Sequence, residues 1–204
     1  MKIIGLTGSI GMGKSVAASM FRSLGVPVED SDAAVHEMFA KGGAAVAAVE
    51  AAFPGAVKDG AVDRAALGKL VYGDPAALKR LESIVHPLVG RHRDAFLARA
   101  RARHVPVVVL DIPLLFEAGL DRLCDVTVVV TAPRFLQEAR VLARPGMARE
   151  RFERILAQQM PDAEKRRRAD YVVQTGIGRA HTLRRLKEIV RLLRAKESHA
   201  RSGT

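Results

Sequence analysis

The sequence predicts an α/β fold, with a parallel five-stranded sheet that carries helices on both of its faces. Three observations support this expectation. Short apolar runs rich in β-branched residues recur along the chain, helical patterns lie between them, and a glycine-rich turn follows the first run. Strands that alternate with helices are typical of parallel sheets, because each crossover between parallel strands needs a connection about as long as a helix.

The first elements follow the order strand, loop, helix, strand. Residues 2–7 form a short apolar run that ends at a glycine-rich turn, as expected of a buried strand. Residues 14–24 place their apolar side chains on one helical stripe, and Gly25 follows as a stop signal. Val26-Pro27-Val28 then predicts a second short strand. This is the beginning of a βαβ arrangement.

The stretch 33–104 differs from its surroundings because it contains helical patterns and no strand run. Turns that contain glycine or proline interrupt it, including one at His86-Pro87. We interpret it as a helical insertion into a core formed by residues 1–32 and 105–204. The later core elements are expected as strands at 106–111, 126–131 and 171–173 and a helix at 180–196, followed by a frayed polar tail from Glu197.

Composition narrows the classes of partner. The 204 residues carry a net charge of +11, which raises the question of nucleic acid. Aromatic residues that stack on bases are nearly absent, so sites for polyanionic small molecules explain the charge better. Cys124 is the single cysteine and excludes an internal disulfide, and no apolar run reaches the roughly 18–20 residues of a membrane span. We expect a cytoplasmic protein without nucleic-acid or membrane partners.

The glycine-rich turn matches a phosphate-binding motif in full. Gly8, four variable residues, Gly13, Lys14 and Ser15 have the Gly-x4-Gly-Lys-Ser spacing, between a predicted strand and a predicted helix. Backbone amides wrap the phosphates, the lysine neutralises the β and γ oxygens, and the Ser15 hydroxyl is a Mg²⁺ ligand. The fold is therefore expected to be that of P-loop nucleoside-triphosphate hydrolases. The expected ATP-binding residues are Gly11, Met12, Gly13, Lys14, Ser15 and Val16.

Carboxylates near the carboxyl ends of strands are candidates for proton transfer and metal binding. Transfer of a phosphoryl group to a hydroxyl needs a base, and Asp32 is the candidate, with Asp30 in reserve. Alternatively, Asp30 and Ser31 cap the following helix. Asp111 ends a strand and is a candidate for holding Mg²⁺ through water, or it is a turn residue. Glu117 either points into an acceptor cleft or begins a helix.

A basic lid is expected at about residues 140–160. A helix ends at Pro145-Gly146, and a second helix runs from about Arg149 to Met160. Arg140 and Arg144 are four residues apart, so they are expected on one helical face, where they can clamp phosphates. Arg154 is a weaker candidate of the same kind, and the run Lys165–Arg168 is expected to be solvated.

The order of several motifs resembles the dephospho-CoA kinase family from Lys2 to about Gly176. The segments that carry the resemblance are the phosphate loop, Asp30-Ser31-Asp32, His86-Pro87-Leu88, residues 111–117, Arg140-x3-Arg144, residues 154–161 with Gln-Met-Pro at the lid exit, and residues 169–173. Ser9, Met12 and Val16 depart from the family's frequent residues. Gln174-Thr175 stands where Asp-Asn is usual, in a loop that approaches the adenine.

The resemblance implies transfer of phosphate from ATP, with Mg²⁺, to the ribose 3′-hydroxyl of dephospho-CoA. It implies that the insertion binds this acceptor and that Asp32, Lys14 and Arg140 are catalytic, with Arg144 at the ATP. The implied acceptor-binding residues are Thr7, Asp32, His86, Pro113, Leu114 and Glu117. We expect a monomer or a weak homo-oligomer. The alternatives are another small-molecule P-loop kinase, such as a nucleoside or nucleotide kinase, and a nucleic-acid-binding ATPase.

Overall fold

The computed structural model describes residues 1–202 and divides into two compact units. The first unit consists of Met1–Glu29 and Ala100–Thr204, and the second consists of Asp30–Arg99. The residue bounds of the second unit are close to those of the stretch 33–104, which we expected as an insertion. Within the described residues, no helix is both long and apolar enough to cross a membrane.

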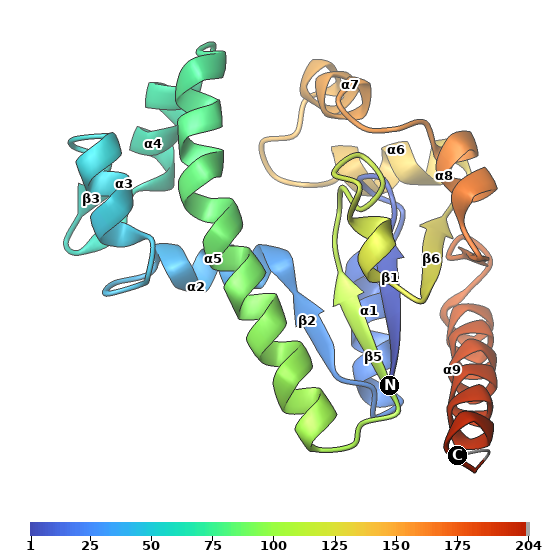
Figure 1. The fold of residues 1–204 in the computed structure, drawn as a ribbon. Coiled ribbons are helices and arrows are strands. Elements are labelled where there is room, and N and C mark those ends of the chain that lie inside the picture. The colour runs from blue at the N-terminus through green and yellow to red at the C-terminus, as the bar shows by residue number, and fades with distance from the viewer. Residues whose placement is uncertain (203–204) are drawn as a thin grey trace. The chain divides into compact units, whose positions relative to one another are not determined.

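The first unit contains the predicted parallel sheet of five strands (Figure 1). Its strands in spatial order are β2 (Val28–Asp30), β5 (Val107–Asp111), β1 (Lys2–Thr7), β6 (Val126–Thr131) and β7 (Tyr171–Gln174). Residue Ile4 of β1 is in register with Val109 of β5 and with Val126 of β6, and both pairings are parallel. The first strand therefore occupies the centre of the sheet. Strands β5 and β2 lie on one side of it, and β6 and β7 lie on the other.

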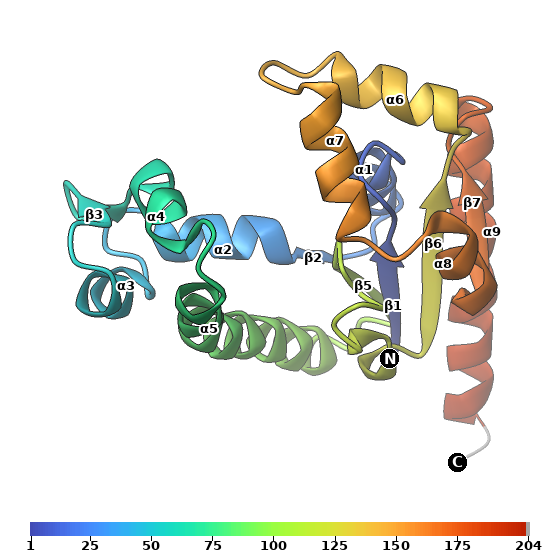
Figure 2. The same ribbon diagram turned by 90° about the horizontal axis from the view of Figure 1, so that it is seen from above.

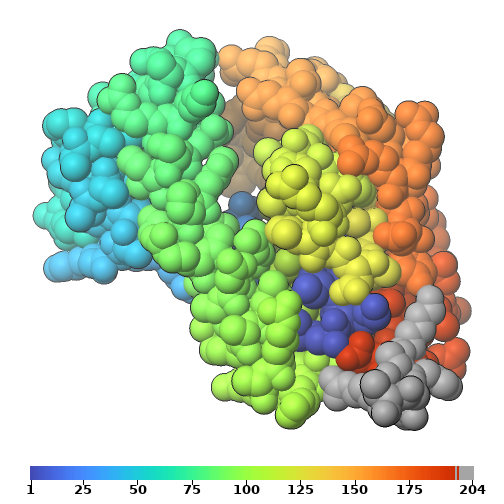
Figure 3. Space-filling view, viewed as in Figure 1, coloured from blue at the N-terminus to red at the C-terminus, as the bar shows by residue number. Residues whose placement is uncertain are grey.

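Side-chain alternation along β1 explains how both faces of the sheet are covered. Ile4 and Leu6 are fully buried in a core shared with α1 (Lys14–Ser23) and α9 (Arg179–Ser202). Gly5 faces the other way, because a Cβ added there would lie 2.8 Å from a methyl group of Leu115 and 2.7 Å from the sulfur of Cys124. The segment after β5, with the 3₁₀ helix η1 (Leu120–Leu123), thus packs on the second face. On the face drawn in Figure 3, a patch of the dark blue N-terminal segment is visible below the yellow segment.

The remaining helices of the first unit belong to the lid region and its exit. Helix α6 (Arg134–Leu142) and α7 (Arg149–Ala157) are joined by a turn, and α8 (Asp162–Arg168) follows the lid exit (Figure 2). The sequence did not predict α8, and the expectation that its basic run is solvated is wrong for Lys165, which is 0% exposed. The final helix continues to Ser202, beyond the expected end at 196, so the expected frayed tail is helical as far as the described residues reach.

The second unit is built mainly from helices. They are α2 (Ser31–Phe39), α3 (Val46–Ala52), α4 (Arg64–Val71) and most of α5 (Pro75–Ala102), around a core of apolar side chains that includes Met38, Val49 and Leu67. Two expectations fail here. A short hairpin, β3 (Val57–Lys58) and β4 (Ala61–Val62), is present where no strand was expected. Pro87 does not end a helix but lies inside α5, where it is exposed and water can satisfy the freed carbonyl group.

Candidate active site

The phosphate loop, residues 8–15, connects the centre of the sheet to the first helix. Gly13 is the N-cap of α1, has a φ of 90° and forms no side-chain cap. The first N–H groups of α1 therefore have neither an intrahelical acceptor nor a capping side chain, and they form a site for an anion. Gly11 also has a positive φ of 78°. Both conformations favour glycine, which explains the motif at these two positions.

Lys14 and Asp111 meet beside this loop. The Lys14 ammonium lies 2.8 Å from a carboxylate oxygen of Asp111, whose side chain is 2% exposed at the end of β5. The structure thus brings together the phosphate-binding lysine and the candidate magnesium residue. A carboxylate and the exposed Ser15 hydroxyl are oxygen ligands of the kind that Mg²⁺ prefers, so these residues fit the ion that P-loop kinases use.

Arg140 connects the lid region to the phosphate loop. Its guanidinium donates hydrogen bonds to the Gly11 carbonyl at 3.3 Å and to the Thr175 carbonyl at 2.9 Å. The Thr175 hydroxyl in turn donates to the Met12 carbonyl at 2.8 Å. The loop after β7 is therefore attached to the phosphate loop through Thr175, a contact that sequence reasoning missed. The signal in the sequence that could have indicated this contact is the pair Gln174-Thr175, which departs from the usual Asp-Asn.

The other lid arginines do not form the expected pair. Arg144 lies beyond the end of α6 at Leu142, so the expectation that it shares a helical face with Arg140 is wrong. Its backbone N–H donates to the Val141 carbonyl in the turn that follows the helix, and α6 ends two residues before Arg144. Arg144 and Arg154 are exposed, and Arg140 is half-buried. Among these three arginines, the structure brings only Arg140 to the phosphate loop.

Met12, a variable position of the motif, and Val16, which follows the motif, have different environments. The Met12 side chain is buried, and its sulfur accepts a hydrogen bond from the Ala132 backbone N–H at 3.1 Å. The loop therefore tolerates a methionine at position 12, because its side chain packs against the end of β6. Val16 is on the exposed side of α1. Any phosphate contact from these residues therefore comes from their backbone amides.

The segment 113–117, here called the acceptor loop, is held at both ends. Thr7 is fully buried and its hydroxyl donates to the Pro113 carbonyl at 2.9 Å, so Thr7 supports the loop. Leu114 is 43% exposed. At the other end, the Glu117 carboxylate accepts from the Met160 N–H at 2.9 Å and forms an ion pair of 2.8 Å with Lys165.

The charge of Glu117 is stabilised by this environment. Burial raises the pKa of the Glu117 carboxyl, but the Lys165 ammonium and the N–H groups of Glu117 and Met160 lower it by more. The net pKa shift is downward. Glu117 is therefore a structural anion between the acceptor loop and the lid exit, and Lys165 is its partner. Sequence reasoning missed this role because Lys165 stands in a run of basic residues that looks solvated.

Asp32 and His86 belong to the second unit. The Asp30 side chain accepts from the Ala33 N–H at 3.1 Å and caps α2, so the capping interpretation of Asp30 is confirmed. Asp32 is exposed in the first turn of α2, and its side chain is available for another role. His86 is exposed in the middle of α5, not at a helix boundary. The catalytic and binding roles of both residues stay predictions.

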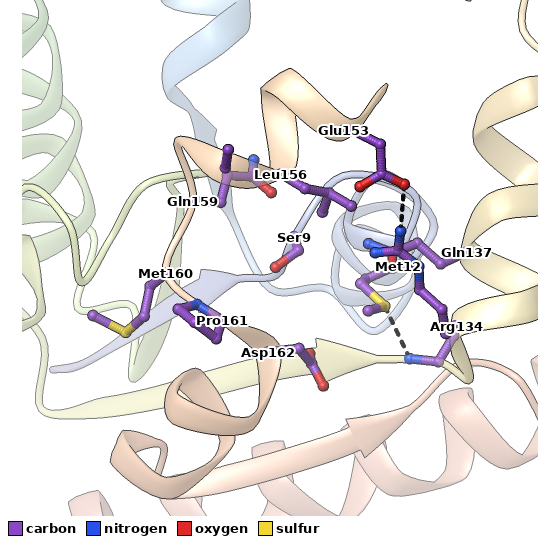
Figure 4. A pocket seen from close by; sticks show the side chains of 12 residues that line it. Ser9, Met12, Arg134, Gln137, Glu153, Leu156, Gln159, Met160, Pro161 and Asp162 are labelled. Carbon is purple, nitrogen blue, oxygen red and sulfur yellow. Dashed lines mark hydrogen bonds and ion pairs between the residues drawn. The ribbon is translucent and has the colours of Figure 1, made fainter. Parts of the chain in front are cut away.

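A pocket of about 480 Å³ lies between the phosphate loop and the lid region (Figure 4). Ser9 and Met12 line it from the loop, Gln137 from α6, and Leu156 and Gln159 from the end of α7 and the lid exit. An ion pair of 2.8 Å between Arg134 and Glu153 joins α6 to α7. The lid and the phosphate loop thus line one pocket together.

The sheet order, the phosphate loop after β1 and the Lys14–Asp111 pair define a P-loop protein that binds nucleoside triphosphates. The family model for dephospho-CoA kinase matches residues 2–179. The chain belongs to the dephospho-CoA kinase family.

Individual relatives agree with this assignment. A dephospho-CoA kinase from Paramagnetospirillum magneticum is 63% identical over 203 residues, which cover 100% of this chain and 96% of that protein. One from Novosphingobium aromaticivorans is 53% identical, with 95% and 96% covered. A crystal structure of a Thermus thermophilus protein has 41% identity and a TM-score of 0.81, with 93% of this chain and 95% of that chain covered. A dephospho-CoA kinase from Campylobacter jejuni has 21% identity and a TM-score of 0.64, with 94% and 97% covered, and shares the fold.

Proposed function

We propose that this protein transfers the γ-phosphoryl group of ATP to the ribose 3′-hydroxyl of dephospho-CoA, which gives coenzyme A and ADP. The observation that carries the proposal is the phosphate loop with its Lys14–Asp111 pair, in a chain that is 63% identical to a dephospho-CoA kinase. Loop and lysine supply the binding site for the donor phosphates, and the family supplies the identity of the acceptor.

The donor side works mainly by electrostatics. The N–H groups at the start of α1 and the Lys14 ammonium neutralise the phosphate oxygens on which charge develops during transfer. Asp111 forms an ion pair with Lys14, which holds the ammonium beside the loop. Mg²⁺, when bound, supplies further neutralisation of the phosphate oxygens, and Ser15 and Asp111 would hold it. Arg140 and Arg144 add positive charge from the lid.

The acceptor side requires a base and a binding surface. Asp32 accepts the proton of the 3′-hydroxyl as its oxygen forms a bond to the γ-phosphorus and the bond from that phosphorus to the β-γ bridging oxygen breaks. ADP leaves with the electrons of that bond. His86 and the acceptor loop with Pro113, Leu114 and Glu117 position the acceptor, and the second unit provides the room for it. We infer a cytoplasmic enzyme that acts as a monomer or a weak homo-oligomer.

Turnover measured with several acceptors tests the proposal. The purified protein is incubated with ATP and Mg²⁺ and with dephospho-CoA, a nucleoside, a nucleoside monophosphate or no acceptor, and ADP release is coupled to a detection enzyme. We expect a clear preference for dephospho-CoA, with coenzyme A identified by mass spectrometry. A preference for another acceptor would make the protein a different small-molecule kinase. Stimulation of ATP hydrolysis by DNA or RNA, with salt-sensitive binding, would indicate a nucleic-acid-dependent ATPase.

A further inference from the structure

Two glutamine side chains bind the same residue of the phosphate loop. The side-chain amide of Gln137 donates to the Ile10 carbonyl at 2.7 Å, and the side-chain oxygen of Gln159 accepts from the Ile10 N–H at 3.0 Å. In Figure 4 the two glutamines lie on either side of Ser9, the neighbour of Ile10 in the loop. Both backbone groups of Ile10 are therefore engaged by side chains, although Ile10 belongs to no helix or strand.

The two glutamines lie at the two ends of the lid. Gln137 is in α6, before the lid turn, and its residue is only 2% exposed. Gln159 follows the end of α7 at Ala157. All the lid arginines lie between them in the sequence. Both ends of the lid are thus attached to Ile10 of the phosphate loop.

Because peptide groups are planar, the hydrogen bonds to Ile10 also fix the directions of the neighbouring peptide groups. In a planar trans peptide the carbonyl and the following N–H point in opposite directions. When Gln137 holds the Ile10 carbonyl on the α6 side, the N–H of Gly11 is directed away from α6. The Ser9 carbonyl is fixed in the same way, and it accepts the N–H of Met12 at 3.1 Å. The glutamines therefore determine the direction of an amide within the anion-binding part of the loop.

The lid exit makes a second connection one residue later. The N–H of Met160 donates to Glu117 of the acceptor loop, whereas the side chain of Gln159 binds the phosphate loop. Adjacent residues of the Gln-Met-Pro segment thus contact the loops assigned to the donor and to the acceptor.

We propose that Gln159 and Gln137 are positioning residues that orient the phosphate loop for ATP and couple its geometry to the lid. The inference rests on the proposed function for its kinetic test, but not for its binding test. The Gln-Met-Pro segment, which served only as a family motif, thereby acquires a physical role. A merely structural role would affect stability without a selective effect on the nucleotide.

Substitution by methionine removes the hydrogen bonds at nearly constant size. The variants are Gln159→Met, Gln137→Met and the double variant, with Gln158→Met as the matched control, because Gln158 is the exposed neighbour of Gln159. We expect kcat/KM for ATP to fall about 5- to 100-fold in each single variant, the range expected when a partly buried N–H or carbonyl loses its partner. KM for dephospho-CoA should change less than about twofold, and Gln158→Met should match the wild type. Because both glutamines act through Ile10, the double variant should lose less than the product of the single losses.

Binding of ADP, measured by calorimetry, separates this inference from the proposed function. If the wild type makes no coenzyme A, the proposed function fails, yet ADP affinity in the variants still tests the positioning role. A lower melting temperature with unchanged ADP affinity and unchanged KM for ATP would overturn the inference. If a variant does not fold, hydrogen exchange of the wild-type Ile10 amide decides. Slow exchange without nucleotide supports the bond to Gln159, and exchange at the rate of an exposed amide overturns it.

Discussion

At the scale of single residues, the site contains charges of two kinds. Lys14 and Asp111 form an ion pair beside the phosphate loop and Asp32 is the proposed base, whereas Glu117 and Lys165 neutralise each other inside the protein. The Lys165 ammonium is fully buried, so it requires a permanent anion as its partner. Asp32 is exposed at the start of α2, so its charge does not require a buried partner.

Replacement of Asp32 by asparagine tests the assignment of the base. Asp32→Asn keeps the size of the side chain but removes its ability to accept a proton, so kcat should fall roughly 10²- to 10⁴-fold. The melting temperature and the affinity for ADP should stay unchanged, because Asp32 is exposed. The control is Asp63→Asn, which changes a helix cap in the same unit. A kcat within threefold of the wild type for Asp32→Asn would rule out the assignment.

The ion pair between Glu117 and Lys165 predicts a stability that depends on pH. Glu117→Gln leaves the Lys165 ammonium buried without its anion and should lower the free energy of unfolding by about 3 kcal/mol near pH 7. The folded pKa of Glu117 lies below its ordinary value of 4.5, so this contribution is complete above pH 4.5 and is lost as pH falls through the folded pKa.

Denaturant unfolding of wild type and Glu117→Gln at several pH values measures this difference. The two free energies of unfolding should converge in acid. The double variant Glu117→Gln with Lys165→Met should be more stable than Glu117→Gln alone, because it no longer buries an unpaired charge. Equal stability of wild type and Glu117→Gln at pH 7 would show that the pair contributes nothing.

At the scale of elements, the phosphate loop depends on contacts with the lid helix as well as on its own glycines. A Cβ added at Gly11 would lie 2.5 Å from a methyl group of Val141 and 3.0 Å from the Gln137 carbonyl. The loop therefore lies against α6 without room for a side chain. Since Arg140 and Gln137 also bind it from α6, the loop and this helix form one structural element.

Two glycine substitutions separate backbone strain from this close contact. Gly25→Ala introduces only strain, because Gly25 has a φ of 69° and no atom within 4 Å of the added Cβ. It should cost about 1 kcal/mol of stability and leave turnover unchanged. Gly11→Ala adds a clash to the strain and should reduce kcat/KM for ATP more than tenfold. Thermal melts and steady-state kinetics of both variants provide the comparison, and equal kinetics would contradict the role of the contact.

At the scale of the whole molecule, two units with separate cores are joined at two points in the chain. The donor site lies within the first unit, which contains the sheet, the phosphate loop and the lid. Ligands for that site should therefore stabilise the first unit specifically. This is a linkage effect, because a ligand that binds only the folded state shifts the unfolding equilibrium.

Thermal unfolding with ADP tests where the nucleotide binds. At 100 times its dissociation constant, ADP should stabilise the first unit by about 2.7 kcal/mol, or roughly 5–10 °C in melting temperature. Lys14→Met should lose most of this shift. Hydrogen exchange should show added protection in residues 8–15 and around Thr175. Equal shifts in wild type and Lys14→Met would show that ADP binds elsewhere.

The sequence by itself determined the sheet, the phosphate loop and the family. These features are local or periodic. A loop that binds phosphate through successive amides is encoded within eight residues, and a buried parallel strand is a run of β-branched residues. The strands at 2–7 and 126–131 were accordingly predicted with their correct bounds.

Only the tertiary structure decided which side chains hold the site together. Gln137 and Ile10 are 127 positions apart, and nothing in the sequence near either residue indicates that they meet. Lys165 resembles its solvated neighbours until packing buries it beside Glu117. Such pairings depend on how distant elements pack, and not on local patterns. The α/β fold was therefore predictable, whereas the contacts that orient its phosphate loop were not.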